Sequence, residues 1–174
     1  DIRKEILQDQ NCGTGVVECA VFLATGLNIY GALFGEGGSI YTAIAFWALG
    51  QTVLVIVGKY YNLITNYNIH EHIEKDNVAV GIGFAGALIG IGNLLRAASA
   101  EHFISWEENL MTFALYMLIG LILLPVSRAL TDRILLPGCR LADELVNQVK
   151  PNQGAAFLEA SSYIGASFLI TWCI

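Results

Sequence analysis

Two glutamates stand inside stretches of the sequence that are otherwise almost wholly apolar. Glu18 lies seven residues after Asn11, and Glu159 lies seven residues after Asn152. A helix rises about 1.5 Å per residue, so each carboxylate would lie about 10 Å inside its helix. A charged side chain at the centre of a bilayer costs about 2.5–3.5 kcal/mol on insertion scales, and less near the interface. We therefore expect both side chains to face protein or water, and not lipid.

These carboxylates are part of a larger set of polar residues in apolar surroundings, and the set allows two interpretations. The glutamates could form an ion or proton path or bind a cationic ligand. Alternatively, each could pair with a cation and hold helices together. The side-chain amides of Gln51 and Asn28 are better suited to hydrogen bonds between helices than to lining a pore. The candidate intramembrane site consists of Glu18, Glu159, Gln51, Asn28, Lys59 and Arg128.

Other patterns that could carry chemistry are weak. His70 and His72 flank Glu71, but residues two apart on a helix point in nearly opposite directions, which is poor geometry for a metal. Gly81, Gly83 and Gly86 match the spacing of a dinucleotide fingerprint without the preceding strand that it requires. The sequence therefore predicts no catalytic residues, no metal site and no cofactor, and we expect that the protein is not an enzyme.

The composition indicates a membrane protein. Of the 174 residues, 55% are hydrophobic and 14% are charged, whereas soluble domains carry about 25% charged residues. Crossing the hydrocarbon core takes about 20 apolar residues in a helix, and backbone groups in lipid must bond within the segment. We therefore predict an all-α membrane protein with about five transmembrane helices. The five apolar blocks are Val16–Phe34, Ile40–Gly58, Val78–Leu95, Leu110–Val126 and Ala155–Ile174.

The loops between these blocks predict the orientation and exclude some partners. With five spans, eight of the nine Lys and Arg residues fall on the side of Asp1, and Arg96 alone falls on the other. Positive loops stay in the cytoplasm, so Asp1 would be cytoplasmic and Ile174 would reach the periplasmic or external side. No basic stripe suggests nucleic acid. The four cysteines form no paired motif, and we expect no disulfides.

Three segments of the chain begin alike, which indicates direct internal repeats. Asn11, Asn77 and Asn152 each stand where a polar loop meets an apolar run, and asparagine is a good helix N-cap. A short amphipathic stretch precedes each of them, as expected for helices at the cytoplasmic interface. We predict one transmembrane domain over residues 1–174. Its repeat units would be about 1–66, 67–140 and 141–174, the last being half a repeat.

The third apolar block is unusually rich in glycine. Gly81, Gly83, Gly86 and Gly90 form rows of small residues that would let helix backbones approach closely. We interpret this block as the packed centre of the bundle or as a seam between subunits. A flexible gating helix is the alternative.

The segments "EKDNVAVGIGFAGALIGIGNLL" and "RILLPGCRLADEL", together with the Asn-headed spans, resemble the "domain of unknown function 350" family of small bacterial inner-membrane proteins. The resemblance implies a multi-pass protein of the bacterial inner membrane, built from tandem pairs of helices. On that pattern we expect helices to precede Asp1. The family has no established activity, so the resemblance implies no reaction.

Two functions remain in competition. The first is a non-enzymatic helix-bundle module that assembles with itself or as an accessory subunit of a membrane complex. Its partners would be membrane lipids and other membrane-protein subunits. The alternative is a small ion or proton channel or transporter that uses Glu18 and Glu159. Whether these two side chains face a bonded partner or open water distinguishes the two hypotheses.

Overall fold

A computed structural model describes residues 1–173, and every regular element in that range is helical. This confirms the predicted all-α class. The elements are α1 (Ile2–Leu7), α2 (Cys12–Phe34), α3 (Ile40–Ile64), α4 (Ile69–Glu74), α5 (Val78–Ala100), α6 (Trp106–Leu130), the π-helical turn η1 (Thr131–Leu135), α7 (Leu141–Val146) and α8 (Gln153–Cys173).

Four stretches of helix in the described residues are long and apolar enough to cross a membrane, namely α2, α3, α5 and α6 with its η1 extension. The fifth predicted span corresponds to α8, which is 21 residues long and is not among these four. Large apolar side chains on the outer faces of these helices are exposed, including Phe22, Val55, Leu118 and Leu169. Such surfaces suit a lipid environment and would be a liability in water.

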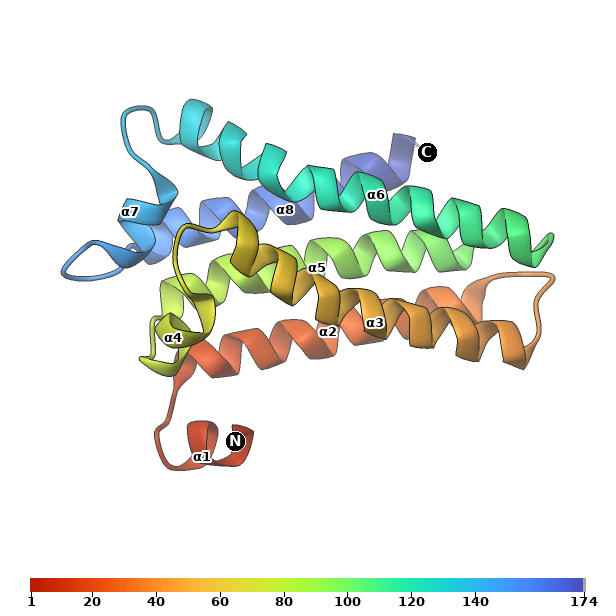
Figure 1. The fold of residues 1–174 in the computed structure, drawn as a ribbon, viewed down its shortest axis with the longest axis horizontal. Helices are drawn as coiled ribbons and strands as arrows, with labels where there is room; N and C mark the ends of the chain where they lie inside the picture. Colours follow the sequence, from red (N-terminus) through yellow and green to blue (C-terminus); the bar gives the residue numbers. More distant parts are fainter. Residues whose placement is uncertain (174) are drawn as a thin grey trace.

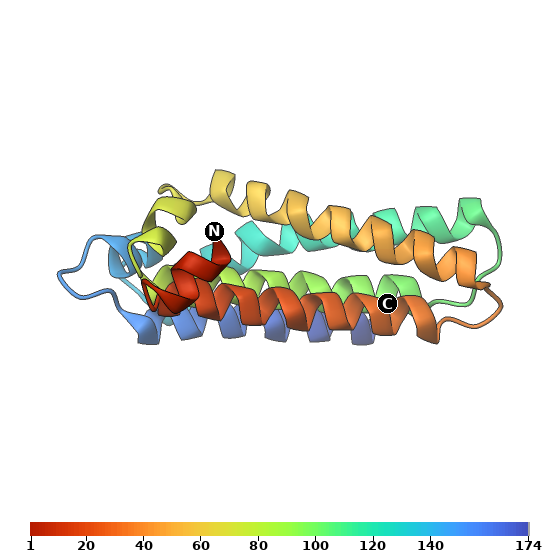
Figure 2. The ribbon, with the colours of Figure 1, turned by 90° about the horizontal axis from the view of Figure 1, so that it is seen from below.

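The long helices form two layers. Figure 2 shows α2, α5 and α8 side by side in one layer, with α3 and α6 crossing above them. In Figure 1, α2, α5 and α8 all begin at the end of the bundle where α4 and α7 lie, so these three helices are parallel. Helix α5 is the central element, since eighteen of its 23 residues are buried. It packs most extensively against α2 on one side and α8 on the other.

Glycines let α5 occupy this central position. A Cβ on Gly81 would lie 2.8 Å from the carbonyl oxygen of Gly13 in α2. A Cβ on Gly86 would lie 2.2 Å from the Cα of Ala160 in α8. Real Cβ atoms do not approach backbone so closely, so only glycine permits these helix separations. The third block is thus the packed centre of the bundle.

The three asparagines begin the three parallel helices. The side-chain oxygens of Asn11, Asn77 and Asn152 each accept a hydrogen bond from the backbone N–H three residues later, at 2.8, 3.1 and 3.1 Å. Each bond satisfies one of the N–H groups that a helix start leaves unpaired.

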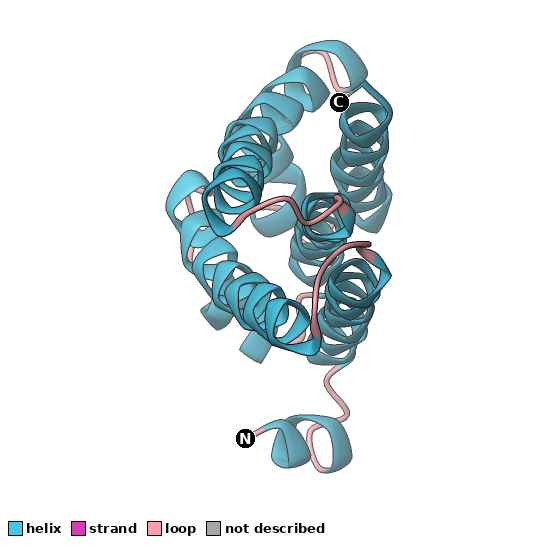
Figure 3. Ribbon diagram, turned by 90° about the vertical axis from the view of Figure 1, so that its right-hand side faces the viewer, coloured by secondary structure: helices cyan, strands magenta, loops and turns pink. Residues whose placement is uncertain are grey.

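The amides of two of these asparagines also tie the helix starts to the short helices. The amide of Asn11 donates to the carbonyl of Ile73 in α4 at 2.8 Å, and the amide of Asn77 donates to the carbonyl of Leu145 in α7 at 2.9 Å. Helix α1 also precedes such an asparagine. Seen along the bundle, however, α1 stands apart from the other helices (Figure 3).

Candidate functional site

The main polar cluster inside the bundle is built around Glu159. This residue follows the start of α8 by two turns and is completely buried. Arg128, near the end of α6, forms a salt bridge with its Oε1 atom. The cation is itself largely buried, with 11% of its side chain exposed. A charged pair is therefore enclosed inside the bundle, toward the end of the helices where α4 and α7 lie.

Two tyrosines complete the contacts of this carboxylate. The hydroxyl of Tyr61, near the end of α3, donates to Glu159 Oε1 at 3.0 Å. The hydroxyl of Tyr163, one turn further along α8, donates to the same oxygen at 2.8 Å. Charge-assisted hydrogen bonds of this kind are stronger than neutral ones. The cluster thus links α3, α6 and α8 through one carboxylate oxygen.

Gly83 of α5 makes room for the other carboxylate oxygen of Glu159. A Cβ at Gly83 would lie 2.7 Å from Glu159 Oε2 and 3.2 Å from the hydroxyl of Tyr61. Within residues 1–173, this Oε2 atom is buried and has no hydrogen-bond partner. Helix α5 therefore contributes space to the site and no polar contact.

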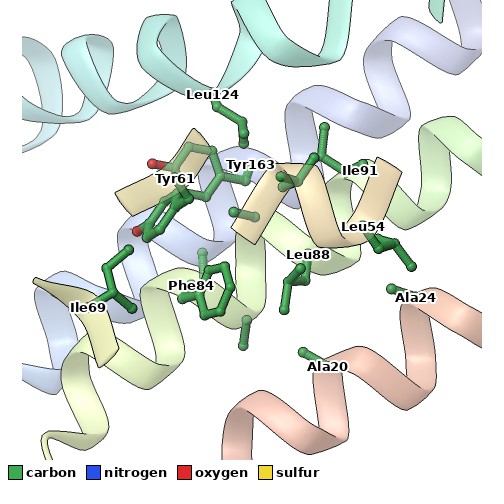
Figure 4. Packing of buried hydrophobic residues seen from close by; sticks show 14 of the residues in the cluster. Ala20, Ala24, Leu54, Tyr61, Ile69, Phe84, Leu88, Ile91, Leu124 and Tyr163 are labelled. Atoms are coloured by element: carbon green, nitrogen blue, oxygen red, sulfur yellow. The ribbon is translucent and has the colours of Figure 1, made fainter. Parts of the chain in front are cut away.

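Aromatic rings close the cluster on its remaining sides. The rings of Tyr61 and Tyr163 meet edge to face at 6.1 Å, and Tyr61 stacks on Phe84 at 5.3 Å (Figure 4). Tyr67, in the connection after α3, places its ring 5.8 Å from the guanidinium carbon of Arg128. Burial, followed by the negative charge of Glu159, raises the pKa of Tyr67 to about 12. This phenol therefore stays protonated at neutral pH.

The other predicted carboxylate and cation lie outside this cluster. Glu18 is half-buried on α2 and makes no hydrogen bond or salt bridge with the residues described. Lys59 on α3 is exposed and likewise has no carboxylate partner in residues 1–173. The structure thus brings Arg128 and Glu159 together and leaves Glu18 and Lys59 apart.

Asn28 and Gln51 belong to a second polar group, between α2 and α3. The Asn28 amide donates to the carbonyl of Trp47 at 3.0 Å, and Thr25 donates to the Gln51 side-chain oxygen at 3.4 Å. A Cβ at Gly50 would lie 2.2 Å from Asn28 Oδ1, so glycine allows the amide to fit. This group joins two neighbouring helices.

Sequence reasoning missed several polar residues. Tyr61 and Tyr163 were not among the predicted site residues, although Tyr163 follows Glu159 by four residues and therefore shares its helical face. Asn93 of α5 was also missed. Its amide donates to Ser167 of α8 at 3.2 Å, and its oxygen accepts from Arg96 at 3.0 Å. An asparagine within an apolar span was the available signal.

The histidine-containing segment is a surface helix. Glu71 of α4 accepts a 2.6 Å hydrogen bond from Lys75, and that bond holds the pKa of the Glu71 carboxyl below its usual range. No group of three or more potential metal ligands occurs in the described part of the chain.

Comparison with known proteins places this architecture in a family. The chain is 25% identical over 126 residues to the UPF0719 transmembrane protein YshE of Bacillus subtilis (strain 168). The matched region covers 72% of this chain and 87% of the relative. No solved structure matches the chain significantly. The family described as "Domain of Unknown Function (DUF350)" matches residues 37–174, from the start of α3 through α8, and the chain belongs to this family of uncharacterised membrane proteins.

Proposed function

We propose that the protein is a non-enzymatic helix-bundle module of the bacterial inner membrane that assembles with itself or as an accessory subunit of a membrane complex. The observation that carries the proposal is the enclosure of Glu159. The Oε1 atom of Glu159 forms a salt bridge with Arg128 and accepts hydrogen bonds from Tyr61 and Tyr163. All three partners belong to the bundle itself. The intramembrane charge therefore serves as a cross-link between helices.

Energetics support a structural role for this pair. Separating two charges inside a protein is costly, and removing one member of a buried pair costs about 3–5 kcal/mol. An ion or proton path through Glu159 would have to break the salt bridge at each passage. Freeing Glu159 Oε1 would be more costly still, because Arg128, Tyr61 and Tyr163 all donate to this atom. Each hydrogen bond to a charged group contributes about 1.5–3 kcal/mol.

The proposed arrangement has five spans, with α8 as the fifth. On this arrangement the end with α4 and α7 faces the cytoplasm, because the Lys and Arg residues gather there. Helix α8 contains one carboxylate, and that carboxylate is neutralised within the bundle. Its membrane insertion is therefore less costly than its hydropathy indicates.

The proposal includes direct repeats, and the Glu159 cluster has a counterpart in them. When the even-numbered apolar blocks are aligned on Gly50 and Gly120, Gly58 corresponds to Arg128. When the Asn-headed blocks are aligned, Phe84 corresponds to Glu159. Gly58 and Phe84 also face each other, since a Cβ on Gly58 would lie 3.5 Å from the Phe84 ring. One repeat would thus use an apolar contact where the next uses an ion pair.

A channel or transporter is the second candidate. It is favoured by the half-buried carboxylate of Glu18, which has no polar partner in residues 1–173, and by the unpaired Oε2 of Glu159. Polar atoms of this kind inside a membrane can mark an ion or proton pathway.

A flux measurement separates these functions. Purified protein would be reconstituted into liposomes, and proton and potassium flux would be compared with empty liposomes, with Glu18→Gln and Glu159→Gln as variants. We expect no flux above the empty liposomes, because Glu159 is closed by protein. We also expect the detergent-solubilised protein to have a mass above that of one chain. Flux that disappears in either variant would favour transport and defeat the proposal.

A further inference from the structure

Helix α6 contains a proline three residues before Arg128, and this proline deprives one backbone carbonyl of its helical partner. In a regular α-helix the carbonyl of Leu121 would accept a hydrogen bond from the N–H of residue 125. Pro125 has no N–H, and a proline ring also crowds the carbonyl four residues before it. Helices bend most readily at such positions. The hydrogen bonding of α6 is therefore interrupted just before its buried cation.

A tyrosine of α3 supplies the missing donor. The hydroxyl of Tyr60 donates a hydrogen bond to the carbonyl oxygen of Leu121 at 3.1 Å. Backbone groups within a bilayer must find partners inside the protein, so this contact satisfies the carbonyl that Pro125 leaves unpaired. The next residue, Tyr61, donates to Glu159 at 3.0 Å. Consecutive tyrosines of α3 thus bind the backbone of α6 and the carboxylate that pairs with its cation.

Helix α6 becomes irregular again shortly after Arg128. The α-helix ends at Leu130, and the π-helical turn η1 follows directly. Turns of this type are rare and frequently occur at functional sites. We call residues 126–135 the arm, because they lie between Pro125 and the end of η1. The arm carries Arg128, which forms the salt bridge with α8.

The corresponding helix of the preceding proposed repeat has neither the proline nor the cation. On the alignment of the even-numbered apolar blocks given above, Val55 of α3 corresponds to Pro125, and Gly58 corresponds to Arg128. The break in the helix and the buried charge therefore occur together in one repeat and are absent together from the other. This pairing indicates that the break serves the ion pair.

We propose that Pro125 is a hinge and that Tyr60 is the latch that holds the arm closed over Glu159. The arm can turn about Pro125 without breaking a backbone hydrogen bond at that residue, because proline has none to donate. Turning the arm away from α8 would carry Arg128 off Glu159 and open the buried carboxylate to water. The arm is thus a cover with two positions for the charge inside the bundle.

Three polar contacts favour the closed position. They are the bond from Tyr60 to Leu121, the salt bridge of Arg128, and a 2.7 Å hydrogen bond from the backbone N–H of Leu141 to Asp132 at the far end of the arm. All three are made in the structure. Opening is therefore the minor state, and its population should rise when a contact is removed.

Thiol labelling of Ser127→Cys measures this opening. Ser127 lies in the arm and is only 4% exposed, so a cysteine there reacts when the arm opens. The chain would carry this cysteine alone, with the four native cysteines replaced by alanine, and its reaction rate with a small methanethiosulfonate would be measured in lipid nanodiscs. We expect Tyr60→Phe to raise the rate about two- to tenfold, which is the effect of losing one hydrogen bond.

A double-mutant cycle makes the test specific for the hinge. Pro125→Ala restores an N–H that can donate to Leu121, so the hydroxyl of Tyr60 is no longer required there. We expect Ser127→Cys to react more slowly in the Pro125→Ala chain. We also expect Tyr60→Phe to leave the rate almost unchanged in that background, because the two residues act on the same carbonyl. An equal effect of Tyr60→Phe with and without Pro125 would overturn the inference.

A buried serine at the other end of the bundle provides the matched control. Ser99 of α5 is 8% exposed, and labelling of Ser99→Cys should not respond to Tyr60→Phe. Equal acceleration at both cysteines would show general loosening of the bundle and would also overturn the hinge. Tyr41→Phe, which alters an exposed tyrosine of α3, should change neither rate.

Hydrogen exchange tests the same motion without a new cysteine. In chains that keep Ser127, the backbone amides of residues 126–130 should lose protection in Tyr60→Phe and regain it when Pro125→Ala is added. Unchanged protection in Tyr60→Phe would contradict the latch. This inference goes beyond the proposed function and does not depend on the assembly of chains, so either can fail without the other.

Discussion

The carboxylate of Glu159 shows how one residue can be both costly and stabilising. A buried charge is destabilising alone, but here a guanidinium and two phenols compensate for the lost water. On the proposed repeat, the apolar contact of Gly58 with Phe84 is the counterpart of this ion pair. We therefore propose that the ion pair selects which helices meet and adds little to the stability that apolar packing would provide.

Breaking this pair from one side has a predictable cost. Arg128→Met should lower the free energy of unfolding by about 3–5 kcal/mol, because Glu159 would remain buried without its cation. The double variant Arg128→Met with Glu159→Leu should recover most of that loss, since it removes both charges. Thermal or denaturant unfolding in a mild detergent measures both effects.

The exposed cation of α3 is the matched control for this prediction. Lys59→Met removes a charge without a carboxylate partner in the described residues, and a surface change of that kind should alter stability by about 0.5 kcal/mol or less. If Arg128→Met were as mild as Lys59→Met, the assigned role of the salt bridge would be wrong.

At the scale of the element, the glycines of α5 determine how close its neighbours lie. Gly86 faces the backbone of α8, and Gly81 faces the backbone of α2. Both contacts involve main-chain atoms, which cannot move aside as a flexible side chain can. The helix separation is therefore sensitive to a single methyl group at these positions.

Gly86→Ala should destabilise the bundle although alanine is the better helix former. The added Cβ would lie 2.2 Å from the Cα of Ala160, and overpacking of this kind costs about 1–3 kcal/mol. Gly26→Ala is the matched control, because its Cβ would meet nothing within 4 Å, and it should be neutral or stabilise by up to about 1 kcal/mol. Equal melting temperatures for the two variants would contradict this account of the α5–α8 contact.

At the scale of the whole molecule, the bundle has two chemically different ends. The short helices α4 and α7 and their charged loops lie at one end, and the tight connections after α2 and α5 lie at the other (Figure 1). The positive charge at the first end predicts that it faces the cytoplasm.

Cysteine labelling in protoplasts tests this orientation. Cys139 lies in the exposed connection before α7, and Glu36 lies in the exposed connection after α2. In single-cysteine chains, a membrane-impermeant maleimide should label Glu36→Cys in intact protoplasts and Cys139 only after permeabilisation. The reverse pattern would invert the proposed orientation. Labelling of both in intact protoplasts would contradict the proposed span count between them.

The sequence determined which segments are helical and where most of them begin. Apolar blocks of about 20 residues must satisfy their backbone groups internally, and an asparagine before an apolar run can cap the first turn. These are local effects, so they could be predicted without knowing which helices meet. The central role of the third block also followed, because its glycines remove the steric barrier to close neighbours.

Only the tertiary structure decided which polar side chains meet. Glu18 and Glu159 hold equivalent positions in the sequence, but only Glu159 has α3 and α6 packed over it. Lys59 and Arg128 were both candidates for the site, yet on the proposed repeat the residue that corresponds to Arg128 is Gly58, one position before Lys59. One residue turns a helix by about 100°, which takes the Lys59 side chain from the core to the surface. The partner of a buried charge depends on the rotation and neighbours of each helix, and these are set by packing across the whole bundle.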